Sequence, residues 1–392
     1  MRVLASADIH LGSPIRSAAM RNPDLADHLK QASRDTFIRI VDLAISEKVD
    51  ALVLAGDIFD NDQPDLRSRA FLISQLARAA DAGVPTVLIR GNHDALLDHR
   101  AHGNLGPNIH LLHKEEPSVE IGGVWFHGLS FDMAHVSKSF LPDYPAPVTG
   151  RKNVGLMHTS LNGSPGHDLY APCSEQDLLA HGYDLWCLGH IHAPFEHTSG
   201  PILAVMPGIP QPRHFGELTG GTVAIVKLDG DTPNIERHHV GHLRFTECAL
   251  DLSQSSDIQE VLSALRSALK GAQRPEHHTA VRLQVTTGHH TAETLTALAS
   301  ELLENIDRVF IDKIKVSAPK QQADAKADDL VRLMRAELSE PGFQLAAQEI
   351  IEELRNALPR EIADDLAEEA LVDLFEEAIA EVALSLHYGA AE

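Results

Sequence analysis

The sequence predicts an α/β protein, in which a two-sheet β-sandwich flanked by helices is followed by a small α/β domain and a helical C-terminal tail. Three observations predict this. Strand and helix patterns alternate over the first quarter of the chain, a strand-rich region follows, and the alternation restarts near Leu243. At 392 residues the chain is also too long for one typical core, so two or three domains are expected.

The opening region alternates short apolar runs with amphipathic helical patterns. Phe37, Ile40 and Val41, for example, recur at helical spacing. We therefore expect strands at residues 2–7, 51–55 and 84–90, and helices at residues 32–47 and 65–81. This β-α-β-α-β order predicts parallel strands whose carboxyl ends face one way.

The next region is richer in strand patterns. Gly122-Gly123 indicates a hairpin, and Asp229-Gly230-Asp231 indicates a turn between two further strands. Strands are expected at residues 124–130, 153–157, 184–188, 202–206, 222–228 and 235–240. They predict a second sheet, and hence a sandwich over residues 1–242.

From residue 243 the pattern of strands and helices begins again. Strands are expected at residues 244–252, 280–286 and 308–316, and helices at residues 258–270 and 291–304, which together make a small domain over residues 243–317. Residues 318–327 have the polar, small-residue composition of a linker. Helical patterns follow at residues 328–338, 343–357 and 361–386.

The tail over residues 328–392 is strongly acidic. From Glu340 to Glu392 there are 14 acidic residues against Arg355 and Arg360. Two interpretations stay open, namely a solvated helix pair packed on its own domain and a partner-docking module.

The net charge of −23 excludes a generally cationic nucleic-acid binder, because attraction of a whole surface to phosphate needs positive charge. The 24 histidines are counted as neutral, and full protonation would bring the charge to about +1. At the ordinary histidine pKa of roughly 6.5, the surface potential is therefore expected to change steeply with pH.

Composition also bounds the compartment. No apolar run reaches the roughly 18 residues of a membrane span, and the chain enters a strand directly after Met1 without a signal-peptide pattern. Cys173, Cys187 and Cys248 lack metal or redox spacing and fit reduced thiols. A cytoplasmic protein is expected.

Polar side chains stand where the expected strands end. Because parallel strands present their carboxyl ends at one edge of a sheet, these side chains are expected to converge there. In the D-x-H and H-x-H pairs, residues two apart in extended conformation point the same way. The residues are Asp8, His10, Asp57, Asn92, His93, Asp94, His158, His190 and His192.

Each motif taken separately fits a turn, a cap or a core histidine. Five in order, each after an expected strand, favour two octahedral-like metal ions instead. Mixed carboxylate, amide and imidazole ligands without thiolate point to Mn²⁺, Fe²⁺ or Zn²⁺. We assign Asp8, His10, Asp57 and His192 to one ion, and Asp57, Asn92, His158 and His190 to the other, with Asp57 bridging.

Two metal ions about 3.5 to 4 Å apart promote in-line displacement at phosphorus, so the expected reaction is phosphoester hydrolysis. His93 is assigned to transition-state stabilisation or leaving-group protonation. Asp94 either orients His93 or caps its loop. Arg213 and His214 are weak candidates for phosphate contact.

These motifs resemble the calcineurin-like metallophosphoesterase superfamily, whose pattern is D-x-H, G-D-x-x-D, G-N-H-D/E, a lone H and G-H-x-H. Within it the chain is similar to the SbcD-type DNA repair exonucleases and most to the bacterial YhaO group. The stretches that carry this resemblance are ADIHLGSP, GDIFDNDQPDLRSRAFL, MHTSLNGSPGHDLYAPC and LGHIHAP. It is strong over residues 1–240, weak over the small domain and nearly absent from the tail.

The resemblance implies the metallophosphoesterase fold, Mn²⁺-dependent cleavage of DNA by an exonuclease or endonuclease in repair, and a capping role for the small domain. It also implies a partner, an SbcC-like ABC-type ATPase with a long coiled coil, and a homodimer is left open. One departure is the loop at residues 207–214 (PGIPQPRH). The family more often has Asn after its Gly and a second Gly before the Arg.

Two other functions remain in competition. A phosphodiesterase or phosphatase acting on small nucleotides or phosphoproteins fits the negative charge. A non-catalytic scaffold on the same fold is disfavoured, because none of the expected ligands is missing from the sequence.

Overall fold

The computed structural model describes residues 1–13, 15, 31–61, 63–97, 105–162, 170–230, 233–317, 319 and 325–338, together with scattered positions beyond residue 339. The chain divides into two compact units. The first comprises Met1–Phe245 and Glu276–His278, and the second comprises Thr246–Pro275 and Thr279–Glu392. The four-part division expected from the sequence stays a proposal.

The first unit contains a six-stranded sheet in the order β12-β11-β1-β2-β3-β4. Strands β1, β2, β3 and β4 are mutually parallel, as the β-α-β-α-β pattern predicted. Strand β11 is antiparallel to β1, and β12 is antiparallel to β11. The expectation that these last two strands belong to the second sheet is wrong, because β11 pairs with β1 of the first sheet. The bounds are β1 Arg2–Ser6, β2 Ala51–Ala55, β3 Thr86–Ile89, β4 Ile109–Leu111, β11 Thr222–Lys227 and β12 Asn234–His239.

A second six-stranded sheet has the order β5-β6-β7-β8-β10-β9. Its four inner strands are parallel, and antiparallel β5 and β9 form the edges. The bounds are β5 Ser118–Ile121, β6 Val124–Gly128, β7 Lys152–His158, β8 Leu185–Gly189, β9 Phe195–Ser199 and β10 Ile202–Met206.

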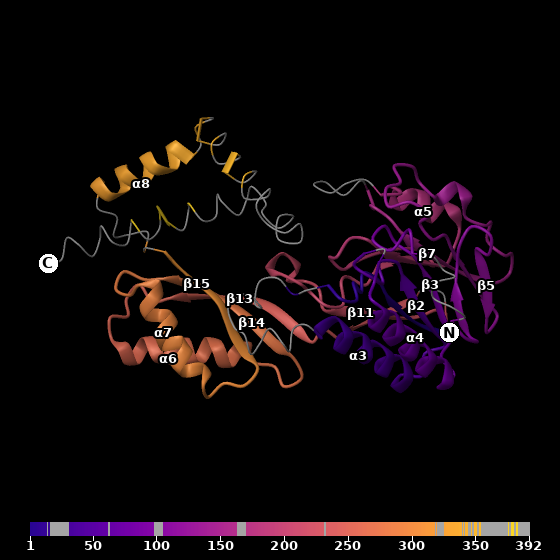
Figure 1. Cartoon of the computed structure of the whole chain (residues 1–392), viewed down its shortest axis with the longest axis horizontal. Coiled ribbons are helices and arrows are strands. Elements are labelled where there is room, and N and C mark those ends of the chain that lie inside the picture. The colour runs from indigo at the N-terminus through magenta and orange to yellow at the C-terminus, as the bar shows by residue number, and fades with distance from the viewer. Residues whose placement is uncertain are drawn as a thin grey trace. The chain divides into compact units, whose positions relative to one another are not determined.

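The two sheets pack face to face, because each contributes buried aliphatic side chains to one shared core that includes Val53 and Leu156. Helices α3 (Ala32–Ser46) and α4 (Leu66–Asp81) cover the outer face of the first sheet through a second core that includes Phe37 and Leu76 (Figure 1). Helix α5 (Glu175–His181) covers the second sheet. The two-sheet sandwich flanked by helices is therefore confirmed.

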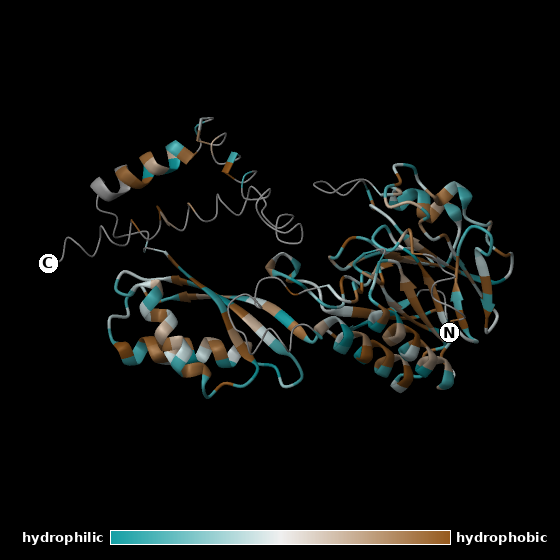
Figure 2. Cartoon of the chain, in the orientation of Figure 1, coloured by the Kyte–Doolittle hydropathy of each residue, from teal (hydrophilic) through white to brown (hydrophobic). Residues whose placement is uncertain are grey.

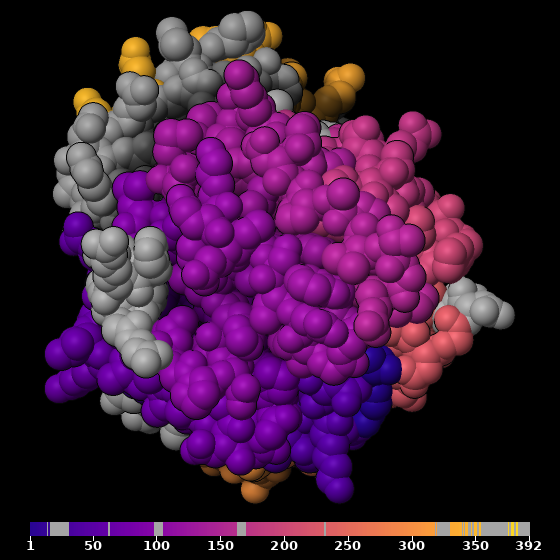
Figure 3. Space-filling view, turned by 90° about the vertical axis from the view of Figure 1, so that its right-hand side faces the viewer, coloured from indigo at the N-terminus to yellow at the C-terminus, as the bar shows by residue number. Residues whose placement is uncertain are grey.

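Hydropathy follows this layering. The inner strands are mostly hydrophobic, while α3 and α4 alternate between hydrophobic and hydrophilic residues (Figure 2). Figure 3 shows one face of the first unit, formed mainly by the violet and magenta residues of the two large sheets and their loops. Burial on both faces explains why β1 and β2 read as continuous apolar runs in the sequence.

The second unit contains a three-stranded sheet in the order β13-β14-β15 with helices α6 and α7, which share one apolar core. Its bounds are β13 Leu243–Asp251, α6 Ile258–Ala272, β14 His278–Thr286, α7 Ala292–Leu303 and β15 Val309–Ser317. Helix α8 spans Ala325–Leu338. It includes the last three residues of the expected linker, where the sequence had predicted no helix. The helices expected at residues 343–357 and 361–386 lie largely outside the described residues.

Two further findings concern the compartment. Within the described ranges, no helix has both the length and the apolar character needed to cross a membrane. All three cysteines are free, with Cys173 and Cys187 buried. Burial raises the pKa of the Cys173 thiol to about 11, which keeps it protonated at neutral pH.

Candidate metal centre

The structure brings all seven expected ligand residues together at the carboxyl ends of five strands. Asp8 follows β1, Asp57 follows β2 and Asn92 follows β3, while His158 ends β7 and His190 follows β8. The side chains of Asp8, His10, Asp57 and His158 are at most 2% exposed. The strand-end pattern predicted a convergence of acids and imidazoles, and the structure forms it from the strand ends of both sheets rather than from one.

The backbone achieves this convergence in an unexpected way. Asp8, His10 and Asp57 have left-handed φ angles of 53°, 46° and 50°, and His190 has a φ of 98°. The expectation that the D-x-H and H-x-H pairs are extended is therefore wrong. Non-glycine residues in this region store strain, which is commonly found at functional sites.

Hydrogen bonds between neighbouring loops hold these strained residues. The N–H groups of Asp8 and His10 donate to the carbonyl oxygens of Gly56 and Asp57, at 3.1 and 3.0 Å. The N–H of His93 donates to Oδ1 of Asp57 at 3.0 Å. Gly91 permits this close approach, because a Cβ there would collide with the Asp57 carboxylate.

His10 and His192 form one half of the cluster. Their Nε2 atoms lie 3.3 Å apart, and Asp57 Oδ2 lies 3.9 Å from Nε2 of His10. Burial lowers the pKa of His10, and the charge of Arg213 lowers it further, against the opposing effect of Asp60. Ligating atoms of Asp8, His10 and His192 all lie within 4.8 Å of one another.

His158, Asn92 and His190 form the other half of the cluster, and His158 links it to Asp57. Its Nε2 lies 3.3 Å from Asp57 Oδ2 and 3.0 Å from Asn92 Oδ1, and His190 Nδ1 lies 3.2 Å from the same amide oxygen. Burial alone would lower the pKa of His158, but the Asp57 carboxylate raises it to about 9. Burial opposes ionisation of Asp57, yet His158 holds its pKa well below the usual range.

The donor set fits divalent cations. Nδ1 of His158 lies 3.0 Å from the Ala55 carbonyl, which can only accept, so Nδ1 carries a proton and Nε2 faces two oxygen acceptors. Two imidazole nitrogens about 2.0–2.1 Å from one ion lie about 2.8–3.4 Å apart at octahedral to tetrahedral angles. The separation of 3.3 Å between His10 and His192 matches this. The residues are thus candidate ligands for divalent metal ions.

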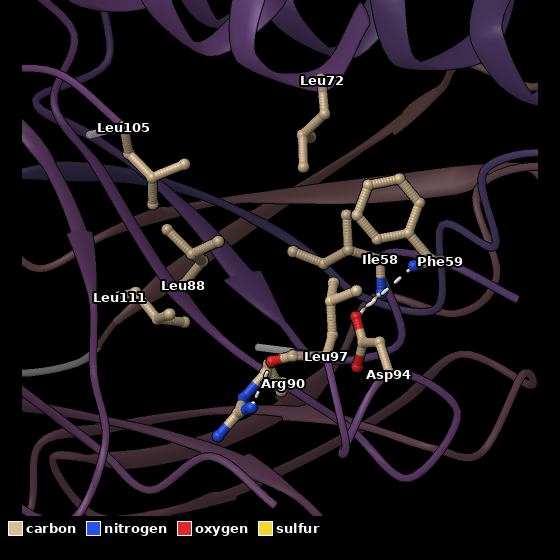
Figure 4. A pocket seen from close by; sticks show the side chains of 9 residues that line it. All are labelled: Ile58, Phe59, Leu72, Leu88, Arg90, Asp94, Leu97, Leu105 and Leu111. Carbon is tan, nitrogen blue, oxygen red and sulfur yellow. Dashed lines mark hydrogen bonds between the residues drawn. The ribbon is translucent and has the colours of Figure 1, made fainter. Parts of the chain in front are cut away.

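His93 and Asp94 are placed differently from each other. His93 is exposed, and its Nδ1 lies 3.0 Å from the carbonyl oxygen of Asp60. Asp94 is buried below the loop, where its carboxylate accepts from the N–H groups of Gly91 at 2.7 Å and Ile58 at 2.9 Å. Figure 4 shows this carboxylate turned toward the backbone of Ile58 and Phe59.

Asp94 therefore ties the loop after β3 to the loop after β2, and its described hydrogen bonds all go to the backbone. The alternative that it orients His93 disagrees with this geometry, and the loop-capping alternative agrees with it. Burial, followed by the charge of Asp57, raises the pKa of Asp94 to about 6.

Arg213 and His214 lie beside the cluster. The guanidinium of Arg213 contacts Asp60 Oδ1 and Glu217 Oε1, both at 3.3 Å. His214 is half exposed, and its Nδ1 accepts from the N–H of Gly216 at 3.1 Å. Their described partners are thus groups of this chain, and phosphate contact by either residue stays a proposal.

Sequence reasoning missed the carboxylate of Glu217, and it gave no role to Asp60, the second Asp of the G-D-x-x-D motif. Asp60 lies beside His10 and Glu217 lies beside His192, and Glu217 is 7% exposed. Burial alone would raise the pKa of Glu217, but the hydrogen bond from His192 and the charge of Arg213 lower it to about 2. Burial also opposes the ionisation of Asp60, while His10 and Arg213 lower its pKa overall. The spacing of four residues between Arg213 and Glu217 was the available indication.

Comparison with known proteins agrees with this chemistry. Residues 1–194 match the family model for calcineurin-like phosphoesterases. An uncharacterised metallophosphoesterase of Bacillus subtilis, YhaO, is 24% identical over 325 residues, which cover 81% of this chain and 77% of the relative. The DNA double-strand break repair protein Mre11 of Sulfolobus acidocaldarius is 25% identical over 304 residues, covering 71% of this chain and 74% of that protein.

Solved structures with a similar arrangement include a dimetal phosphatase from Danio rerio. The match covers 62% of this chain and 98% of the phosphatase, with 12% identity and a TM-score of 0.39. A Thermus thermophilus protein, TT1561, covers 61% of this chain and 98% of that one, with 15% identity and a TM-score of 0.38.

Proposed function

We propose that the chain, whose residues 1–194 match the family model for calcineurin-like phosphoesterases, is a two-metal phosphodiester hydrolase that cleaves DNA as an exonuclease or endonuclease. The observation that carries the proposal is the buried cluster around Asp57, in which the imidazoles of His10 and His158 face one carboxylate and the amide of Asn92 contacts His158. Buried groups of this kind are compensated by a cation or by a dense hydrogen-bond network, and this donor set fits a cation.

The chain's own residues would divide into two sets of ligands around Asp57. We propose that Mn²⁺ is the native ion, as the resemblance to SbcD-type nucleases implies. When bound, such ions neutralise phosphate oxygens and activate water. The first set is Asp8, His10, Asp57 and His192, and the second is Asp57, Asn92, His158 and His190.

His93 is the proposed acid. Because the Asp60 carbonyl only accepts, Nδ1 of His93 carries a proton and its Nε2 remains for the substrate. A protonated His93 can therefore donate from Nε2 to the leaving oxygen of a phosphodiester. The ring of His93 is exposed, and its centroid lies 4.9 Å from that of His10, so it faces solvent directly beside the proposed ligands.

DNA as substrate is supported by the relative from Sulfolobus acidocaldarius, which is named for double-strand break repair and is matched over 74% of its length. The overall charge of −23 opposes DNA binding, but binding depends on the field inside the site. Bound cations and Arg213 would supply positive charge there. The same negative charge favours the second candidate, a phosphodiesterase for small nucleotides.

One assay separates these two functions. The purified full chain is incubated with Mn²⁺ and end-labelled single- and double-stranded DNA, and in parallel with cyclic nucleotides, with EDTA as the metal-free control. We expect DNA shortening that depends on Mn²⁺. Intact DNA alongside turnover of cyclic nucleotides would replace the nuclease with the second candidate.

We further propose that the chain works with an SbcC-like ABC-type ATPase and that the acidic tail contacts it. The tail's charge supports this placement, because an acidic segment would be repelled from a DNA-binding cleft. Removal of residues 318–392 should retain intrinsic nuclease activity and abolish co-purification of the ATPase. Unchanged co-purification would reject the tail as the docking module.

A further inference from the structure

A carboxylate lies behind each of the two imidazoles whose Nε2 atoms face each other. Nδ1 of His192 lies 2.7 Å from Oε1 of Glu217. Nδ1 of His10 lies 3.0 Å from Oδ1 of Asp60, close enough for an ion pair but not aligned for a hydrogen bond. In each ring Nδ1 therefore faces a carboxylate, and Nε2 faces the other ring.

The contact with Glu217 determines how His192 carries its proton. An ionised carboxylate only accepts, so Nδ1 of His192 is the donor and Nε2 presents a lone pair. This is the tautomer that a metal ion requires. It also restrains the ring's orientation, because Nδ1 is held 2.7 Å from a buried acceptor. Nη2 of Arg213 lies 3.4 Å from the same nitrogen.

Glu217 is itself held from several directions. Its Oε2 accepts from the backbone N–H of Arg213 at 2.6 Å, and its Oε1 contacts the guanidinium of Arg213 at 3.3 Å. The same guanidinium contacts Asp60 at 3.3 Å. Arg213 therefore bridges the carboxylate behind His192 and the carboxylate behind His10.

We propose that Glu217 is the positioning residue for His192, and that Arg213, by joining Glu217 to Asp60, locks His10 and His192 into one pre-organised ligand pair. This rests on the proposed function, since it takes both histidines as metal ligands. It also gives Arg213 a role within the site that needs no phosphate. Carboxylates that hold ligating histidines in this way typically contribute 10- to 100-fold, roughly, to metal affinity.

The chain offers a matched control pair. Nδ1 of His197 lies 2.7 Å from Oε2 of Glu175, the same separation as between His192 and Glu217. Neither His197 nor Glu175 belongs to the proposed ligand set. Glu175→Gln therefore removes an equivalent charge from an equivalent contact elsewhere in the first unit.

The experiment measures Mn²⁺ binding to the full chain by titration calorimetry, without substrate. We expect Glu217→Gln to weaken the affinity of one of two ions by roughly 10- to 100-fold. Glu175→Gln should leave both affinities unchanged. The visible spectrum of the Co²⁺-loaded protein should also change in Glu217→Gln, because that spectrum reports ligand geometry, which a purely structural role for Glu217 would leave alone.

A double-mutant cycle tests whether Glu217 acts through His192. If it does, Glu217→Gln should have no further effect in a His192→Gln background. Losses that add, or a Glu217→Gln variant with wild-type affinity and spectrum, would overturn the proposal. Melting of each variant in EDTA checks the fold. If Glu217→Gln does not fold, Glu217→Asp takes its place. This variant keeps the negative charge, but its side chain is one methylene shorter, so the carboxylate lies farther from His192.

The two proposals fail in different ways. If Mn²⁺ binding is weakened by Glu217→Gln but the wild-type chain leaves DNA intact, DNA is rejected as the substrate and the role of Glu217 stands. A wild-type chain that binds no divalent ion would overturn both.

Discussion

At the scale of single residues, His93 and Asp57 are close in space but differ in what they touch. Asp57 is 2% exposed and faces His10 and His158, whereas the ring of His93 is exposed and anchored on the Asp60 carbonyl. The backbone N–H of His93 still donates to Asp57. Truncation of the His93 side chain leaves this contact intact, whereas truncation of Asp57 removes its acceptor, so the two substitutions separate the two roles.

We predict that His93→Ala keeps its metal and loses hydrolysis by about 10²- to 10⁴-fold, the usual contribution of a general acid. Asp57→Ala should lose both, since it removes the carboxylate that both halves of the cluster face. Metal content by mass spectrometry, measured with the rate on the same sample, distinguishes them. A His93→Ala protein without metal would contradict this division of roles.

Single residues also show which features of the site could be predicted from the sequence and which could not. The ligands could be predicted because each directly follows an apolar run, and strand direction puts those ends together. The left-handed backbone at Asp8 and His10 could not be predicted, because it depends on hydrogen bonds to a loop more than 40 residues away in the sequence. Glu217 was missed because its partner His192 lies 25 positions earlier, on a different loop.

At the scale of elements, the loop at residues 207–214 departs from the family pattern and is held by a buried glutamine. Gln211 is 3% exposed. Its Oε1 accepts from Thr36 Oγ1 at 2.9 Å and from the N–H of His242 at 2.8 Å. Its Nε2 donates to the carbonyl of Pro212 at 2.7 Å. The loop that carries Arg213 is thereby tied to α3 and to the start of β13.

Gln211→Ala should lower the free energy of unfolding by about 1–3 kcal/mol, because buried donors and acceptors lose their partner. The midpoint of urea denaturation of the first unit is the measurement. The control is Gln31→Ala, which removes one exposed hydrogen bond from the Arg34 guanidinium within the same unit. Equal midpoints for the two variants would show that Gln211 does not anchor the loop.

Most of the regular elements followed from periodicity, since buried strands and two-faced helices impose their repeat on the sequence. The missed elements are those with weak repeats. Strand β9 is a sheet edge whose residues are mostly exposed, so its sequence (FEHTS) lacks an apolar run. Helix α5 has only seven residues, and its capping box of Ser174 and Asp177 was its clearest mark.

At the scale of the whole molecule, the histidines do not titrate together. Burial lowers the pKa of His110, His127 and His277, and Asp57 raises that of His158 against burial. The expected steep change in surface potential near pH 6.5 treated all 24 as ordinary histidines. Because these pKa values are shifted in both directions, the change in surface potential is spread over a wider pH range than composition suggests.

The lowered pKa of His239 predicts how the stability of the fold depends on pH. Burial, followed by the charges of His277, Arg244 and Arg39, lowers its pKa from 6.5 to about 3. Between those pH values the unfolded chain binds a proton that the folded chain does not. Because the state that binds more protons gains as pH falls, the free energy of unfolding should decrease from pH 6.5 downward through pH 3.

We predict that His239→Gln, which cannot take up this proton in either state, loses less stability than the wild type over this window. Urea denaturation at several pH values between 6.5 and 4 measures the slope. His197→Gln serves as the control, because its ring is 39% exposed and lies outside this histidine and arginine group. If His239→Gln and the wild type lost stability in parallel, His239 would already be protonated in the folded chain, and the positive groups around it would not be excluding the proton.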